Sequence, residues 1–77
     1  MNVDLAIRGS LAKLPGDEVG EASLRDELQQ HGMTPEDADL ALERAVLDGY
    51  VARAAGGRLT KLPRAFLAAQ PGALPQP

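Results

Sequence analysis

Apolar residues recur at helical spacing near the start of the chain, which predicts a first helix over residues 3–14. Asn2 is a suitable N-cap for it, and Pro15-Gly16 is a suitable stop. Residues 17–22 are polar and contain glycine, so they are expected to form a loop, with a short strand as the alternative. The apolar stripe of the helix consists of Val3, Ile7, Leu11 and Leu14.

Two further helices are predicted in close succession, separated by a tight turn. Ser23 is a suitable N-cap for a helix of about two turns, and Gly32 suits the left-handed residue that follows its end. Thr34 is a suitable N-cap for the next helix, with Pro35 at the first helical position. Gly49 is expected to terminate that helix.

The stretch YVARAAGGRLTKL has two β-compatible arms around Gly56-Gly57. A Gly-Gly pair supplies the positive φ angles that a two-residue hairpin turn requires. Pro63 has no N–H to donate to a sheet, so the hairpin ends there. The register that follows from a two-residue turn places Val51 opposite Leu62 and Arg53 opposite Thr60.

After the hairpin, the segment PRAFLAAQ is expected to form one or two turns of helix, with Phe66 and Leu67 folding back on the core. The final PGALPQP is rich in proline, which favours an extended and mobile segment. The predicted organisation is a single domain over residues 1–69 followed by a flexible tail over residues 70–77.

The predicted order is helix, short loop or strand, helix, tight turn, helix and Gly-tipped hairpin. Through SLRDELQQHGMTPEDADLALERAVLDGYV and the wing RAAGGRLTKL, this order resembles the winged helix-turn-helix superfamily over about residues 3–62. The resemblance implies a mainly α fold with a three-helix core and a small β-hairpin as the wing. Winged helices serve both DNA binding and protein contact, so the resemblance leaves the function open.

Two narrower likenesses accompany this one. The acidic character is similar to that of winged helices appended to replication proteins, such as archaeal replicative helicases. The stretch LRDELQQHGMTPEDADLALERAV also resembles the three-helix repeats of RecX-type recombination regulators, but the hairpin after Gly49 does not suit that family.

Length and composition exclude several classes of function. A chain of 77 residues makes one small domain whose core stabilises it only marginally, so dimerisation or partner binding is expected. The absence of cysteine excludes disulfides and thiolate zinc sites and fits a cytoplasmic location. One Tyr, one Phe and no Trp make base stacking on single-stranded nucleic acid a weak hypothesis. No apolar run has the length of a membrane span, and no signal peptide is recognisable.

The charges are unevenly distributed along the chain. Residues 17–48 hold ten acids and two bases, whereas residues 49–77 hold four bases and no acid. This asymmetry predicts an acidic side and a basic side, with ordinary solvation of both surfaces as the alternative.

The third predicted helix has an unusual outward side. Its predicted core side consists of Pro35, Ala38, Leu42, Ala45 and Val46, with Ala41 at the edge. The opposite side carries Glu36, Leu40, Glu43 and Leu47. A DNA-reading helix needs basic, amide or hydroxyl side chains there, and carboxylates are repelled by phosphates. We therefore expect this side to contact another helix, in a homodimer or in a partner. The alternative is that the first helix or residues 63–70 cover it.

The basic residues support a second hypothesis, a DNA-binding transcriptional or replication-associated regulator that contacts the phosphate backbone weakly through its wing. The same cations would also suit the acidic face of a neighbouring copy, or would protect an edge hairpin from aggregation. The candidate nucleic-acid contacts are Arg25, Arg53, Arg58, Lys61 and Arg64.

No catalytic constellation is present in the sequence. His31 has no second ligand at helical spacing and is better explained by its place at a helix C-terminus. Ser10, Ser23 and Thr34 have no recognisable His–Asp relay. We therefore predict a non-enzymatic module for protein interaction or assembly, without cofactor, metal, membrane or small-molecule substrate.

Overall fold

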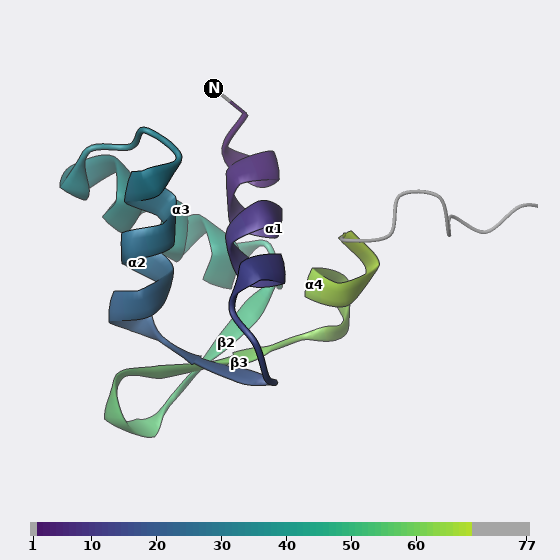
Figure 1. The fold of residues 1–77 in the computed structure, drawn as a ribbon. Helices are drawn as coiled ribbons and strands as arrows, with labels where there is room; N and C mark the ends of the chain where they lie inside the picture. The colour runs from purple at the N-terminus through teal and green to yellow at the C-terminus, as the bar shows by residue number, and fades with distance from the viewer. Residues whose placement is uncertain (1, 69–77) are drawn as a thin grey trace, which may run out of the picture.

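A small antiparallel sheet with helices packed on one of its sides makes up the fold, which is mainly helical. The computed structural model describes residues 2–68, and side chains as far as residue 65. Of the helices, α1, α2 and α3 stand over the sheet, and the short α4 follows the last strand (Figure 1). The predicted tail over residues 70–77 and the predicted packing of Phe66 and Leu67 lie outside this described part.

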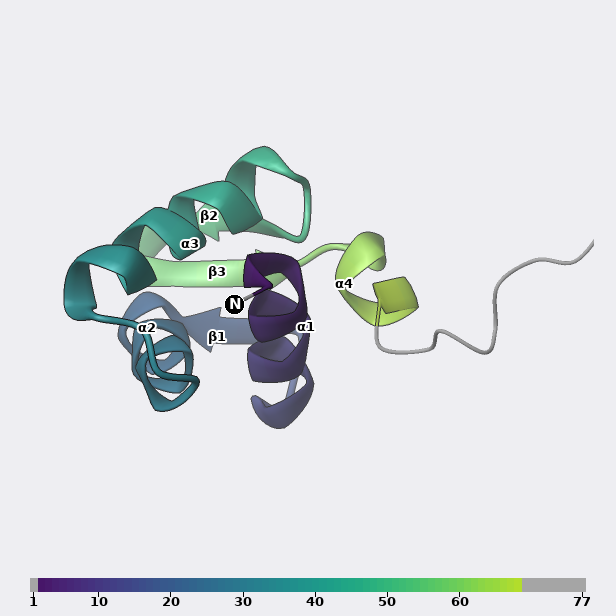
Figure 2. The ribbon, with the colours of Figure 1, turned by 90° about the horizontal axis from the view of Figure 1, so that it is seen from above.

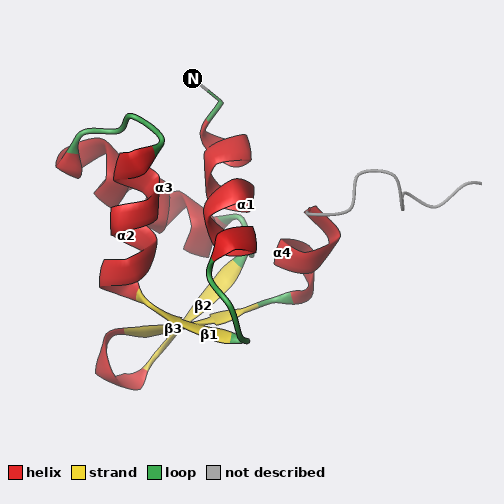
Figure 3. Ribbon diagram, viewed as in Figure 1, coloured by secondary structure: helices red, strands yellow, loops and turns green. Residues whose placement is uncertain are grey.

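Helices and strands are interspersed along the chain, with two helices in direct succession and then two strands joined by a short turn (Figure 3). None of the helices in the described part is long and apolar enough to cross a bilayer. In order, the elements are α1 (Val3–Lys13), β1 (Glu18–Gly20), α2 (Glu21–Gln30), α3 (Pro35–Leu47), β2 (Val51–Ala54), β3 (Arg58–Lys61) and α4 (Pro63–Ala68).

The caps predicted for α1 and α3 are confirmed. The Asn2 side chain accepts a hydrogen bond from the Leu5 N–H at 3.2 Å and so begins α1. The Thr34 hydroxyl accepts from the Asp37 N–H at 3.1 Å and begins α3 in the same way. Gly49 follows the end of α3 with φ of 81°, a conformation that a residue with a Cβ rarely adopts.

The predicted N-cap of α2 is wrong. The helix begins at Glu21, directly after β1, so Ser23 lies within its first turn. Gly20 occupies the cap position, so no side chain caps the start of this helix. The reason is tertiary, because β1 pairs with β3 and the helix starts as soon as the strand ends. The predicted end is confirmed, since Gly32 has φ of 97°.

β3 is the central strand, with β1 and β2 antiparallel on either side of it (Figure 2). The short strand that was the alternative for residues 17–22 is therefore present as β1. Val19 of β1 lies opposite Leu59 of β3, and both side chains are buried. β1 therefore gives β3 a second neighbouring strand. The inward face of the three strands packs beneath the helices.

The predicted hairpin register is wrong by one residue. Arg53 lies opposite Leu59, because the loop contains three residues, Ala55–Gly57, rather than two. Gly56 and Gly57 do have the positive φ angles expected of them, 72° and 71°. A shift of one residue turns each side chain of one strand to the other face of the sheet. As a result, Leu59 points into the core and is fully buried.

The core lies between the helices and the sheet and draws on every element as far as the start of α4. The prediction for the inner side of α3 is mostly confirmed, although Pro35 is exposed because the packed part of the helix begins at Ala38. Val46 is partly buried against the core. The buried residues of α3 are Ala38, Ala41, Leu42 and Ala45.

Gly9 marks a close approach between α1 and the end of α2. A Cβ added at Gly9 would lie 3.4 Å from Cε1 of His31, which is an ordinary van der Waals contact. Gly9→Ala is therefore expected to raise the free energy of unfolding by about 0.5–1 kcal/mol, the difference in helix propensity. Urea denaturation followed by circular dichroism measures it. Gly9→Val is the control, because it adds the same Cβ but has a lower helix propensity than Ala; a gain from Val equal to that from Ala would contradict the role given to helix propensity.

Candidate functional site

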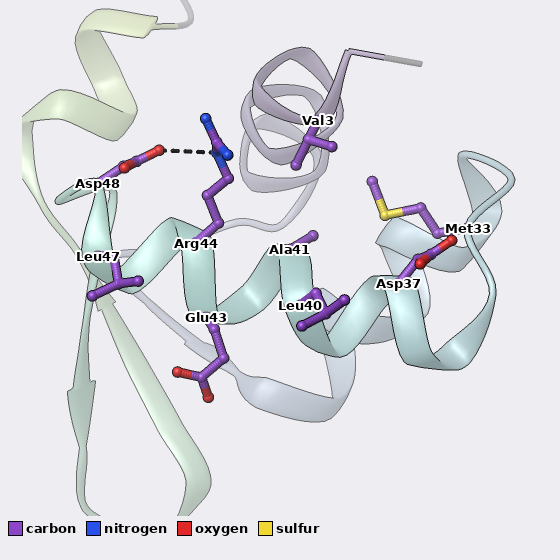
Figure 4. Close-up of a pocket in the computed structure, with 9 residues that line it drawn as sticks. All are labelled: Val3, Met33, Asp37, Leu40, Ala41, Glu43, Arg44, Leu47 and Asp48. Carbon is purple, nitrogen blue, oxygen red and sulfur yellow. Dashed lines mark ion pairs between the residues drawn. The ribbon is translucent and has the colours of Figure 1, made fainter.

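The outward side of α3 carries the two most exposed large apolar residues in the described part of the chain. Leu40 is 68% exposed and Leu47 is 83% exposed. Glu43 lies between them, and all three side chains point to the same side of the helix (Figure 4). Neither α1 nor the described part of α4 covers the two leucines, and residues 69–70 of the alternative lie outside the described residues.

A shallow groove of ≈ 670 Å³ runs along this side of α3. Its far wall comes from outside the helix, because Val3 of α1 and Met33 of the preceding turn line it. Val3 was predicted on the core stripe of α1 and does pack, partly buried, against the core, but its place beside α3 was not predicted. No prediction was made for Met33. The lining residues are Val3, Met33, Asp37, Leu40, Ala41, Glu43, Arg44, Leu47 and Asp48.

Among the residues that the structure describes, Arg44 is the one basic residue that lines this groove. Its Nε lies 3.3 Å from Oδ2 of Asp48, one turn along α3, and 3.6 Å from Oδ1 of Asp4 on α1. Figure 4 shows the pair with Asp48 at the end of the groove. Because one guanidinium serves two carboxylates, this end of the groove keeps an excess of negative charge.

A second group of ion pairs joins α3 to the sheet. Arg53 of β2 donates from Nη1 to Oε2 of Glu21 at 2.9 Å, and from Nη2 to Glu43. Arg25 of α2 donates to Oδ1 of Asp39 at 2.5 Å and lies 4.0 Å from Glu21. This network contains two guanidinium groups and three carboxylates, so it also has an excess of negative charge.

The other candidate nucleic-acid contacts are held by the protein itself. Arg58 donates from Nε to Oε1 of Glu18 at 3.1 Å. Lys61 donates from Nζ to the carbonyl oxygen of Leu14. The guanidinium of Arg64 lies 4.9 Å from the centroid of the Tyr50 ring. Two bases from the basic part of the sequence, Arg53 and Arg58, therefore pair with glutamates from its acidic part.

Around α3 and its ion-pair networks, acids outnumber bases by seven to three in the described structure. Two of the acids, Glu36 and Asp37, are exposed and make no ion pair within residues 2–68. The surface of α3 is therefore apolar along its centre and anionic along its edges. The bases are Arg25, Arg44 and Arg53; the acids are Asp4, Glu21, Glu36, Asp37, Asp39, Glu43 and Asp48.

No protein-family model, curated protein or solved structure matches this chain. Among the residues that the structure describes, no three His, Cys, Asp or Glu side chains are grouped so that they could hold a metal ion. The outward side of α3, with its groove, is the candidate functional site.

Proposed function

We propose that this chain is a winged-helix module that binds protein through the outward side of α3, and that it is not an enzyme. The element order supports the assignment, since a winged helix places a short strand before its second helix and a hairpin after its third. The sheet order β1-β3-β2 supports it further, because β1 joins the hairpin as a third strand. In this architecture α3 is the helix that a DNA-binding relative would place in the major groove.

The exposure of Leu40 and Leu47 carries the proposal. Each leucine that a partner buries contributes roughly 1.5–3 kcal/mol to association. Val3 and Met33 line the far wall of the groove beside them, although Met33 is itself buried. A partner that covers this side of α3 would therefore bury both leucines at once.

Two observations favour protein over duplex DNA as the ligand. The acids of α3 would face the phosphates of a duplex, which repel them. Arg53 and Arg58 are already paired with glutamates, so part of their positive charge is neutralised before any phosphate approaches. Weak binding through the wing is the alternative function.

The test of the proposal is Leu40→Asp combined with Leu47→Asp. We expect the double variant to lose self-association or capture of a protein partner, because charge replaces the apolar centre of the surface. Far-UV circular dichroism should stay near that of the unmodified protein, since neither side chain is buried. Sedimentation velocity and affinity capture measure the effect. Leu5→Asp is the matched control, because Leu5 is 59% exposed on α1 but does not line the groove.

Unchanged assembly and an unchanged set of captured partners in the double variant would contradict the proposal. A mobility-shift assay with duplex DNA at low salt completes the comparison. Binding that falls steeply with salt and is lost in Arg58→Glu would support the alternative function instead.

A further inference from the structure

We propose that the partner presents a cationic amphipathic helix, which lies along the groove of α3 with its apolar side on Leu40 and Leu47 and its Lys or Arg residues on the acids at the edges. This inference rests on the proposed function and specifies the chemistry of the partner. Recognition of an amphipathic helix in an apolar groove is a common mode of protein–protein binding.

The dimensions of the groove suit a helix. Leu40 and Leu47 are seven residues apart on α3, so their positions are separated by about 10 Å along the helix axis. Apolar residues on one side of a partner helix recur at intervals of three and four residues. Every second one is therefore seven residues along, the same separation as between Leu40 and Leu47. Val3 and Met33 form the wall against which such a helix would lie.

The negative charge of the groove determines the sign of the charge that the partner must carry. Asp37, Glu43 and Asp48 line the groove, whereas Arg44 is shared between Asp48 and Asp4. A basic partner residue would meet unpaired carboxylate at Asp37 and would relieve the excess of negative charge at either end. An acidic partner residue would add to the same repulsion.

Charge also argues against two other occupants. A second copy of the chain, docked through the same surface, would double the excess of carboxylates in one interface. Residues 69–77 of this chain contain no Lys or Arg, so that segment offers no charge complementary to the groove. A basic helix from another protein satisfies both the apolar centre and the anionic edges.

The experiment is a display selection on the immobilised full chain. The library contains peptides of about 16 residues with apolar residues fixed at helical spacing and all other positions random. The double variant with Leu40→Asp and Leu47→Asp is used to remove peptides that bind elsewhere. We expect the enriched peptides to carry an excess of Lys and Arg, and their affinity to fall as salt is raised.

A charge variant of the chain then tests the contacts directly. Combining Asp37→Asn with Glu43→Gln and Asp48→Asn should weaken binding of an enriched peptide by about threefold to tenfold, as expected when several exposed ion pairs are lost. Asp17→Asn is the matched control, since Asp17 is an exposed acid that does not line the groove. Equal affinity of the triple variant and the unmodified chain would overturn the inference.

The remaining outcomes separate the inference from the proposed function. Enriched peptides that depend on both leucines but are neutral or acidic would overturn the basic partner and leave the protein-binding surface in place. If no peptide is enriched and sedimentation velocity shows a dimer that depends on Leu40 and Leu47, the occupant is a second copy of the chain. This result too would overturn the basic partner and leave the protein-binding surface in place. If neither peptides nor self-association depend on the leucines, both proposals are wrong.

Discussion

Tyr50→Ala is expected to lower the free energy of unfolding by about 3–5 kcal/mol, the range for truncation of a buried aromatic residue. A chain of 77 residues has a total stability of only about 4–12 kcal/mol. Tyr50 is fully buried and is the largest of the fully buried side chains. Loss of its ring would therefore remove a large share of the stability, and a substantial fraction of the variant should be unfolded at physiological temperature.

The position of Tyr50 explains why the effect is large. Its N–H donates to the carbonyl oxygen of Ala45 at 2.9 Å, and its own carbonyl oxygen accepts from the Leu62 N–H at 2.9 Å. The residue therefore joins the end of α3 to the start of β2 and the end of β3. Its ring packs in the core, with Arg64 over it and Arg8 donating to the hydroxyl oxygen at 3.4 Å.

Urea denaturation followed by far-UV circular dichroism measures this prediction, with Tyr50→Phe as the matched control. The control keeps the ring and loses only the hydrogen bond from Arg8, so it should lower stability by about 0.5–1.5 kcal/mol at most. Equal losses in Tyr50→Ala and Tyr50→Phe would show that the ring contributes little, contrary to its burial.

Leu59→Ala is expected to lower the free energy of unfolding by about 2–5 kcal/mol, whereas the same substitution at Leu47 should change it by no more than about 0.5 kcal/mol. The two substitutions remove the same atoms. They differ in burial, because Leu59 is fully buried and Leu47 is 83% exposed. Thermal and urea denaturation of the two variants measure the difference.

This comparison also tests the hairpin register. A two-residue turn would place Leu59 on the outer face of the sheet, where its truncation would have a small effect. Losses of similar size in Leu59→Ala and Leu47→Ala would therefore favour the register with Arg53 opposite Thr60 over the one in the structure.

Local signals in the sequence predicted α1 and α3 well, because their caps are formed by residues next to the helix. Asn2, Thr34 and Gly49 act on neighbouring backbone, so their roles do not depend on the rest of the fold. The start of α2 could not be predicted in this way. Ser23 is a good cap in isolation, but the pairing of β1 with a strand about forty residues later determines where the helix begins.

The hairpin shows the same limit. Gly56 and Gly57 fit a two-residue loop and a three-residue loop equally well, since both loops use positive φ angles. The choice between them follows from the burial of Leu59 against Val19, a contact between distant parts of the chain. Sequence patterns predicted the turn, and tertiary packing determined its length.

For the candidate site, the periodicity of α3 was sufficient to predict that Leu40, Glu43 and Leu47 share one side. The wall of the groove was not predictable, because it depends on how close the start of α1 comes to α3. The pairing of Arg53 with Glu21 and Glu43 was also not predictable, because it requires β2 to pass beneath two helices. Helical spacing determines which residues share a side, and tertiary structure determines what surrounds them.

The inner side of α3 has a consequence for how such a module can change over evolutionary time. Three of its four buried residues are alanines, so the helix is held by short side chains that leave little freedom for replacement. Leu40 and Leu47 on the outer side are exposed, so selection for folding hardly restricts them. Under the proposed function, specificity for a new partner can therefore evolve at these two positions with almost no loss of stability.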